Sequence, residues 1–282
     1  MVTILFRGFY TVASGMIAQQ RRTELLTNNM ANANTPGYKA DQSVIRSFPD
    51  MLMSRLGNTQ IPTDDPLQLK TLNRVGAINA GVYMQETLPL FTQGQINETE
   101  LTTDVALIDG NVPTNPATGK PGAFLFRLEN QGQGESYTRN GNFTLDGQGF
   151  LVNPQGLYVL SDEGTRIQLQ NDDFSVVADG RILVDDVEVN RIGISFAENP
   201  QALLKEDNGL FRTADETDLP SAYTTPEATF SMQQGFLEGS NVDSARTMTD
   251  MLTAYRAFEA NQKVLQAYDR SMEKAVNEIG RV

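Results

Sequence analysis

Apolar residues recur at alternating steps of four and three residues near both ends of the chain. Near the N-terminus six of eight positions in this line are apolar: Leu5, Phe9, Val12, Met16, Gln19, Thr23, Leu26 and Met30. Near the C-terminus eight of eleven are apolar: Ser244, Met248, Met251, Tyr255, Phe258, Gln262, Leu265, Asp269, Met272, Val276 and Ile279. This spacing places side chains on one face of an α-helix. The pattern therefore predicts one long helix in each terminal segment.

Two explanations fit such lines of apolar residues. The commoner one is an amphipathic helix that packs on the core of its own domain. Here the lines are narrow and keep strict heptad spacing, and they stand at opposite ends of the chain, which favours paired helices in a bundle or coiled coil. Pro36-Gly37 ends the first helix, and Asn241 and Asp243 offer oxygens that can cap the start of the second.

The middle of the chain has the pattern of β structure. Between residues 95 and 232, short apolar or alternating runs recur and are separated by turn signals such as Asn140-Gly141, Asp146-Gly147 and Asp179-Gly180. Such spacing is typical of a sandwich or barrel-like domain built from hairpins. In the region before it, prolines argue against one long helix, and we expect a short helix over residues 48–56 followed by extended strands.

These patterns together predict an α+β fold. Long N- and C-terminal helices form a bundle or coiled coil, and the central domain is all-β and rich in hairpins. We expect a discontinuous terminal helical domain of residues 1–35 and 235–282, a connecting region of residues 36–94, and a β domain of residues 95–234.

The composition narrows the possible chemistry. The 282 residues include no histidine and no cysteine, which removes zinc sites with these ligands, Ser-His-Asp triads, cysteine nucleophiles and disulfides. The acidic pairs Asp64-Asp65, Asp172-Asp173 and Asp185-Asp186 follow no calcium-loop pattern, so we interpret them as solvated turn carboxylates. We expect no catalytic residue, no cofactor and no metal, and hence no enzyme.

Charge is distributed unevenly along the chain. The net charge is −13, but residues 1–40 carry four basic residues and one acidic residue, and residues 241–282 carry six of each. The acidic excess therefore lies in the middle, which we expect to face solvent. Such acidity disfavours nucleic acid and anionic membranes as partners. The apolar run over residues 2–6 is too short for a cleavable export signal, which indicates a cytoplasmic protein or a route without cleavage.

Four segments of the sequence resemble one protein family. They are TNNMANANTPGYKA at residues 27–40, QGQINETELTTDVALIDG at 93–110, YTRNGNFTLDGQGFLV at 137–152, and the stretch from QGFLEGSNVDSARTM to AYRAFEANQKVLQAYDRSM within 234–272. In this order they are similar to the signatures of the bacterial flagellar rod and hook proteins, in particular the distal and proximal rod group. A Pro/Gly/Asn loop at residues 111–122 departs from the family, which usually continues here with a Gly-Phe-Phe strand.

The resemblance implies a structural role and a location in the flagellar basal body. In this family the terminal helices line an axial tube that transmits torque, and the subunits leave the cell uncleaved through the flagellar type III export apparatus. The implied partners are further copies of the chain and other rod and hook proteins, with no nucleic acid and no membrane insertion. Two alternatives stay open: a hook or other axial protein, and a secreted carbohydrate-binding β protein.

The resemblance also assigns roles to residues. We expect the apolar members of the two lines to form the assembly interface, and the turn Asn34-Thr35-Pro36-Gly37-Tyr38 to act as a family motif. Phe48 and Leu52 resemble an export-gate motif of early flagellar substrates. Two core residues one helical turn apart would explain the same spacing equally well.

Overall fold

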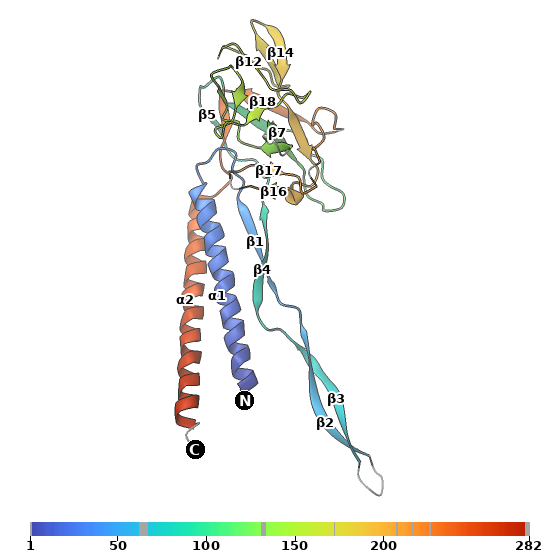
Figure 1. The fold of residues 1–282 in the computed structure, drawn as a ribbon, viewed down its shortest axis with the longest axis vertical. Helices are drawn as coiled ribbons and strands as arrows, with labels where there is room; N and C mark the ends of the chain where they lie inside the picture. Colours follow the sequence, from blue (N-terminus) through green and yellow to red (C-terminus); the bar gives the residue numbers. More distant parts are fainter. Residues whose placement is uncertain are drawn as a thin grey trace. The chain divides into compact units, whose positions relative to one another are not determined.

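The computed structural model describes residues 2–61, 67–130, 134–171, 173–206, 208–215, 217–225 and 227–279. The chain divides into two compact units, which we describe separately (Figure 1). The helical unit comprises residues 1–27, 43–87 and 248–282, and the β unit comprises residues 28–42 and 88–247. Among the described residues, no helix is both long and apolar enough to cross a membrane.

Two antiparallel helices lie side by side in the helical unit (Figure 1). They are α1, Val2–Ala31, and α2, Ser244–Lys274, which continues into a π-helical turn, Ala275–Ile279. Side chains join them at several levels: the Thr27 hydroxyl lies 3.7 Å from the sulfur of Met251, and Arg22 lies 4.0 Å from Asp250. Gly8 of α1 lies against the hydroxyl end of the Tyr268 side chain, so a methyl group at this position would overlap the phenol.

The predicted bundle or coiled coil is wrong. The described residues contain only two long helices, and no third helix is present among them to complete a bundle. In α2 the least exposed residues at heptad spacing are Thr247, Met251, Ala254, Phe258, Asn261, Leu265 and Tyr268. Three of these seven residues, Thr247, Ala254 and Asn261, are small or polar. The predicted members Met248 and Tyr255 each lie one position after Thr247 and Ala254 and are exposed. Aromatic and amide side chains over glycines replace the interlocking apolar side chains of a coiled coil.

The third segment of the helical unit, residues 43–87, is extended. It includes most of β1, Asp41–Ser47, and of its partner β4, Val82–Pro89, and all of β2, Met51–Ile61, and its partner β3, Leu67–Ile78. The antiparallel ladder of β2 and β3 runs from Met51 opposite Ile78 to Ile61 opposite Leu67. The expected short helix over residues 48–56 is therefore wrong. Pairing with β3 satisfies the backbone hydrogen bonds of residues 51–56. Such a tertiary contact overrides a weak helical preference.

The β unit is built around the central strand β7, Ala123–Glu129. The largest sheet has the order β16-β17-β8-β7-β11-β10-β9, and β15 also pairs with β7. Its strands are β8 Glu135–Thr138, β9 Thr144–Leu145, β10 Leu151–Val152, β11 Tyr158–Val159, β15 Ile194–Ala197, β16 Leu204–Lys205 and β17 Phe211–Arg212. A 3-10 turn, Pro200–Ala202, precedes β16.

Smaller sheets complete the β unit and bring distant segments together. β12 Ser175–Val176, β13 Arg181–Val184 and β14 Val187–Arg191 form one sheet, β6 Val105–Asp109 pairs with β18 Phe230–Gln234, and β5 Ile96–Glu98 pairs with β19 Phe236–Glu238. The two latter pairs join residues 96–109 to residues 230–238, more than 100 residues further along the chain. The mostly β centre agrees with the sequence pattern.

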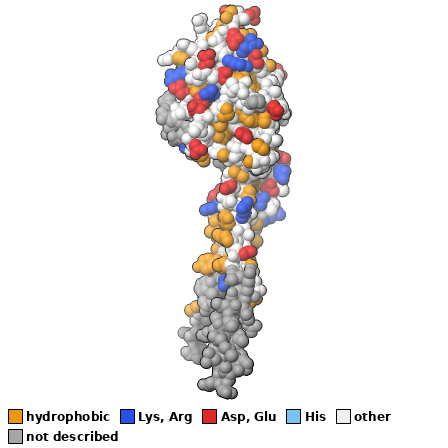
Figure 2. Space-filling model, turned by 90° about the vertical axis from the view of Figure 1, so that its right-hand side faces the viewer, with side chains coloured by type: hydrophobic (Ala, Val, Ile, Leu, Met, Phe, Trp, Pro, Cys, Tyr) orange, Lys and Arg blue, Asp and Glu red, His pale blue; other side chains and the backbone are white. Residues whose placement is uncertain are grey.

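The core of the β unit lies on both faces of β7. Phe124, Phe126 and Leu128 point into the larger apolar cluster, whereas Leu125 points into a smaller one with Tyr137. All five side chains are at most 1% exposed. Acidic and basic side chains are interspersed over the surface of this unit on the face shown in Figure 2, with hydrophobic side chains between them.

Candidate assembly site

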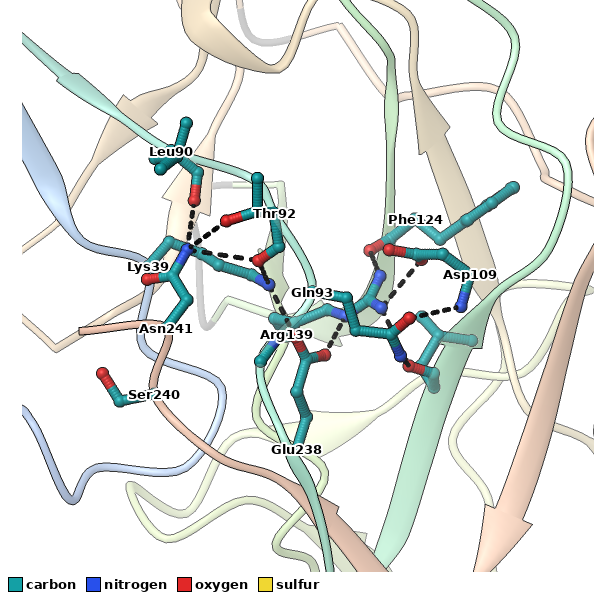
Figure 3. A network of polar contacts seen from close by, with 12 residues as sticks. Lys39, Leu90, Thr92, Gln93, Asp109, Phe124, Arg139, Glu238, Ser240 and Asn241 are labelled. Atoms are coloured by element: carbon teal, nitrogen blue, oxygen red, sulfur yellow. Dashed lines mark hydrogen bonds and ion pairs between the residues drawn. The ribbon is translucent and has the colours of Figure 1, made fainter. Parts of the chain in front are cut away.

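Four segments that are distant in the sequence meet in the β unit (Figure 3). Lys39 follows α1, residues 93–109 lead into and include β6, Arg139 follows β8, and Glu238 ends β19. Lys39, Arg139 and Glu238 are each 2% exposed. We call this group, together with Asp109 and Asn241, the junction network. Its charged members are two cations and two anions, so the buried charge is balanced.

Glu238 is the centre of the junction network. One carboxylate oxygen accepts hydrogen bonds from Lys39 Nζ at 2.7 Å and from the amide of Gly94 at 2.8 Å. The other accepts a hydrogen bond from Arg139 Nε at 2.5 Å. The backbone carbonyl of Glu238 accepts a hydrogen bond from the amide of Gly37 at 2.8 Å. A single residue near the end of the β unit therefore binds three earlier segments.

Arg139 uses its remaining donors on the neighbouring strands. Nη1 donates to the carbonyl of Phe124 at 2.7 Å, and Nη2 donates to the carbonyl of Leu107 at 2.8 Å. Nη2 also lies 2.8 Å from a carboxylate oxygen of Asp109, an ion pair that lacks hydrogen-bond alignment. The fixed fork of a guanidinium suits such simultaneous contacts. Arg139 thereby ties β6 and β7 to Glu238.

Burial and charge act in opposite directions on the two ends of the Lys39–Glu238 pair. Burial lowers the pKa of Lys39, although the carboxylate of Glu238 opposes this effect. Burial would raise the pKa of Glu238, but the charges of Arg139 and Lys39 outweigh it and hold that pKa below its usual range. Because the cations of the network stabilise the carboxylate, we treat Glu238 as ionised at neutral pH.

Asn241 extends the network toward the connection between β4 and β5. Its side-chain amide donates to the carbonyls of Leu90 at 2.7 Å and Thr92 at 3.1 Å, and its side-chain oxygen accepts from the amide of Ala40 at 2.7 Å. Lys39 Nζ also donates to the carbonyl of Thr92 at 2.8 Å. Asn241 was expected to cap α2, but it lies before Asp243, whose carboxylate accepts from the amide of Arg246 at 3.0 Å.

The turn after α1 has a conformation that requires glycine. Gly37 has a φ of +68°, and a methyl group on it would overlap the backbone of Arg139 and Asn140. The next residue, Tyr38, is buried, and its hydroxyl donates to the side-chain oxygens of Asn28 at 2.8 Å and Asn29 at 3.1 Å. The turn therefore packs on the backbone of Arg139 and Asn140 and is also held by the end of α1.

Three family models match the chain. "Flagella basal body rod protein" matches residues 9–39, "Flagellar hook protein FlgE/F/G D1 domain" matches residues 122–184, and "Flagellar basal body rod FlgEFG protein C-terminal" matches residues 233–278. The junction network takes Lys39 from the first region, Arg139 from the second and Glu238 from the third. It therefore joins all three matched regions in the folded chain.

The chain is also similar to named proteins over its whole length. The flagellar hook-basal body complex protein FlhO of Bacillus subtilis is 42% identical over 99% of this chain and 100% of that protein. The chain belongs to the flagellar basal-body rod and hook protein family. The basal-body rod protein FlgG of B. subtilis is 30% identical over 97% of this chain and 99% of its own length. The rod protein FlgF of Salmonella typhimurium is 30% identical over 95% of this chain and 96% of its own length.

Some of the expected interface residues are buried or half-buried in the single chain, and others are exposed. In α1, Leu26 is buried, and Phe9, Val12, Met16 and Met30 are half-buried. In α2, Met251, Phe258, Leu265 and Met272 are half-buried, whereas Met248 and Tyr255 are exposed, as is Val276 in the π-helical turn that follows. The side chains of Leu5 and Ile279 lie outside the described residues. Whether these residues form an interface between subunits stays a prediction.

The residues of the expected motifs also have distinct surroundings. In the turn, Asn34 and Thr35 are exposed, Pro36 is half-buried, and Gly37 and Tyr38 are buried. Phe48 of the possible export motif is 40% exposed, and its ring centre lies 5.1 Å from that of Tyr83. The side chain of Leu52 lies outside the described residues.

The sequence patterns missed the charged members of the junction network. Lys39, Arg139 and Glu238 all lie inside the segments that carry the family resemblance, yet the apolar lines drew attention to other residues. Asn241 was considered only as a cap of the second helix. The sequence did contain a signal that these residues are buried. Each of them lies beside turn residues or beside a short apolar strand, and such strands are expected to be buried. In the described part of the chain, no three acidic side chains gather as a metal site would require.

Proposed function

We propose that the chain is a structural subunit of the flagellar basal-body rod and that its helical unit makes the contacts between subunits. The rod role is supported by the full-length similarity to rod proteins. The single observation that carries the contact role is the exposed apolar surface of both terminal helices. Met248, Tyr255 and Tyr10 are 53%, 53% and 65% exposed in the single chain. A large apolar surface left open in one subunit is typical of a protein–protein contact.

The proposed partners are further copies of the chain and other rod and hook proteins. The proposed work is mechanical, and the chain has no catalytic role in this proposal. Export through the flagellar type III apparatus is part of it, with Phe48 and Leu52 as the candidate recognition residues. The junction network serves the same function by holding the segments next to the two helices, residues 37–39 and 238–241, in fixed relation within the β unit.

A complementation experiment tests the rod role. The gene is deleted and replaced by a tagged wild-type copy, and basal bodies are purified, imaged and probed for the tag. We expect the tagged chain to copurify with basal bodies, and the deletion strain to lack a complete rod. Absence of the chain from basal bodies, or normal basal bodies in the deletion strain, would refute the proposed function.

A substitution in α2 tests the role of the helices. Leu265→Asp places a carboxylate on the half-buried face toward α1, which costs several kcal/mol if the carboxylate stays unpaired. We expect this variant to be exported but to leave cells non-motile. The matched control is Val187→Asp on β14, where the valine is 65% exposed and the same change should be tolerated. Wild-type swimming by the Leu265 variant would show that this face does not matter for assembly.

A further inference from the structure

Two Asn-Gly dipeptides occur in the sequence, Asn140-Gly141 and Asn208-Gly209. In such a pair the asparagine side chain can react with the backbone nitrogen of the next residue. Glycine favours this reaction, because it has no side chain to hinder the approach and adopts backbone conformations that other residues avoid. The two pairs have very different surroundings in the folded chain, and these surroundings decide which pair can react.

Asn208-Gly209 lies in the loop of the hairpin that joins β16 to β17. The two strands pair directly, and the amide of Glu206 donates to the carbonyl of Leu210 at 2.8 Å, which closes the loop. Asn208 is exposed, and among the described residues no hydrogen bond holds its side chain. Gly209 has a φ of +73°, and no atom lies within 4 Å of the position that a methyl group would take on it. The side-chain amide of Asn208 therefore has room to approach the backbone nitrogen of Gly209.

Within the described part of the chain, one hydrogen bond restrains the nitrogen that would react. The amide of Gly209 donates to the carbonyl of Glu206 at 3.2 Å, which is at the long end of the range for such bonds. Exposed loops with few packed neighbours open locally at a much smaller cost than global unfolding. Loss of this one bond frees the nitrogen while the two strands stay paired.

Asn140-Gly141 is held in the packed interior of the β unit. The side-chain oxygen of Asn140 accepts a hydrogen bond from the amide of Asn142 at 3.0 Å. Gly141 is buried, and a methyl group on it would overlap the carbonyl of Val105. The carbonyl of Gly141 also accepts a hydrogen bond from the amide of Val105 at 3.0 Å. The reaction needs rotation of both residues, so it requires a much larger opening of the structure here than in the hairpin loop.

From this contrast we propose that Asn208 is a site of spontaneous deamidation in the folded protein and that its isoaspartate product loosens the hairpin. The backbone nitrogen of Gly209 attacks Cγ of Asn208, a new C–N bond forms, and the bond from Cγ to the side-chain nitrogen breaks. That nitrogen leaves as ammonia and takes the proton of the Gly209 amide. Water then opens the cyclic imide at either of its two carbonyl carbons, which gives aspartate or isoaspartate. The overall reaction exchanges ammonia for water without a change of oxidation state, and it is independent of the proposed function.

The isoaspartate product changes what the hairpin holds. Lys205 on β16 donates to the carbonyl of Lys39 and to the carboxylate of Asp41, both at 3.0 Å, and its ammonium lies 4.0 Å from the centre of the Tyr38 ring. Directly opposite on β17 is Phe211, which is 1% exposed. An isoaspartyl link runs through the former side chain and adds a backbone atom to the loop. It therefore strains the pairing of Lys205 with Phe211 and weakens the contacts of Lys205 with the segment after α1.

Peptide mass spectrometry of the purified full-length chain tests the site. The folded chain is incubated at mildly alkaline pH, where the backbone nitrogen loses its proton more readily, and deamidation of both Asn-Gly pairs is followed over weeks. We expect Asn208 to react at least about ten times faster than Asn140, since a factor of ten requires only about 1.4 kcal/mol of extra activation free energy at Asn140. The matched variant is Asn208→Gln, whose longer side chain forms a cyclic imide far more slowly.

The same chain unfolded in guanidinium chloride separates the effect of the fold from that of the neighbouring residues. Without the fold both pairs are free, so their rates should become similar. Equal rates at Asn208 and Asn140 in the folded chain would overturn the proposal. So would a folded chain in which neither pair reacts while both react in the unfolded chain. If Asn140 stays slow in the unfolded chain, its protection does not come from the fold, and the structural argument fails.

Hydrogen exchange tests the effect on the contacts of Lys205. Deamidated chains are separated from unmodified chains by ion exchange, and an isoaspartyl methyltransferase assay identifies the fraction that carries isoaspartate. Amide exchange in residues 38–41 is compared among this fraction, the fresh chain and the Asn208→Asp variant, which has the same added charge on a normal backbone. We expect faster exchange in the isoaspartate fraction alone. Equal exchange in all three proteins, or equally fast exchange in the Asn208→Asp variant, would overturn the proposed loosening.

Discussion

Replacement of Glu238 by glutamine tests the junction network at its centre. The substitution preserves the shape of the side chain but removes the charge that faces Lys39 Nζ at 2.7 Å and Arg139 Nε at 2.5 Å. These three side chains are 1–2% exposed, so water does not replace the lost partner. Among the described residues of the junction network, Asp109, which is 19% exposed, is then the one remaining anion.

The structure sets the expected size of the effect. Removing one partner of a buried ion pair costs about 3–5 kcal/mol, because the other charge stays buried without compensation. Single domains are stabilised by about 5–15 kcal/mol in total. We therefore expect Glu238→Gln to lower the free energy of unfolding by about 3 kcal/mol or more. Denaturant titration of the purified full-length chain at pH 7 measures this loss.

The pH dependence gives an independent check. Because the pKa of Glu238 is held below its ordinary value of 4.5, the unfolded chain takes up a proton more readily than the folded chain. The stabilisation is thus fully present above pH 4.5 and is lost as the pH falls through the lower pKa of the folded state. The wild type should lose stability in this acid range, and the Glu238→Gln variant should lose this part of the dependence.

The control is the same substitution in an exposed pair. Glu129 binds Arg166, and the two side chains are 33% and 44% exposed. Water screens such a pair, so Glu129→Gln should cost much less than Glu238→Gln. If both variants lose the same small amount of stability, water reaches the junction network. The argument for a buried link between the four segments would then fail.

Two other substitutions test the turn and the export motif. Gly37→Ala places a side chain on a left-handed backbone and makes it overlap the backbone of Arg139 and Asn140, so it should cost well over the roughly 1–2 kcal/mol of a left-handed residue alone. Gly119→Ala has a similar φ of +66° with no atom within 4 Å, and should cost only about that amount; equal losses in thermal unfolding would contradict the packing argument. Phe48→Ala with Leu52→Ala should abolish export while the purified chain stays folded, and normal secretion would remove this motif from consideration.

The turns between neighbouring strands were the features that the sequence predicted best. Asp146-Gly147 joins β9 to β10, Asp179-Gly180 joins β12 to β13, and Asp185-Asp186 joins β13 to β14, each between paired neighbours. At the first of these, the Asp146 carboxylate accepts the amides of Gln148 and Phe150, both at 2.8 Å. When a side chain hydrogen-bonds to the backbone of its own turn, neighbouring residues alone determine the conformation of that turn. Such a turn can therefore be predicted from the sequence.

Pairings between distant segments could not be predicted in the same way. The pair of β6 and β18 and the pair of β5 and β19 connect strands more than 100 residues apart, and no turn specifies them. Apolar spacing was also insufficient in α2. Met248 and Tyr255 are apolar but exposed, whereas Ala254 and Asn261 lie on the side toward α1. The spacing of apolar residues shows that one face of a helix is apolar. It does not show which segment or which chain covers that face.

The junction network also bears on the order of folding. Lys39 and Glu238 are 199 residues apart, and Arg139 and Glu238 are 99 residues apart. Contacts of such separation form only after the loops between them have closed, which slows folding. The buried ion pairs therefore cannot stabilise the chain until its last fifth is available. Export through the flagellar type III apparatus, as we propose it, is compatible with this property if the chain passes unfolded, because the junction network cannot form while Lys39 and Glu238 are still on different sides of the export channel.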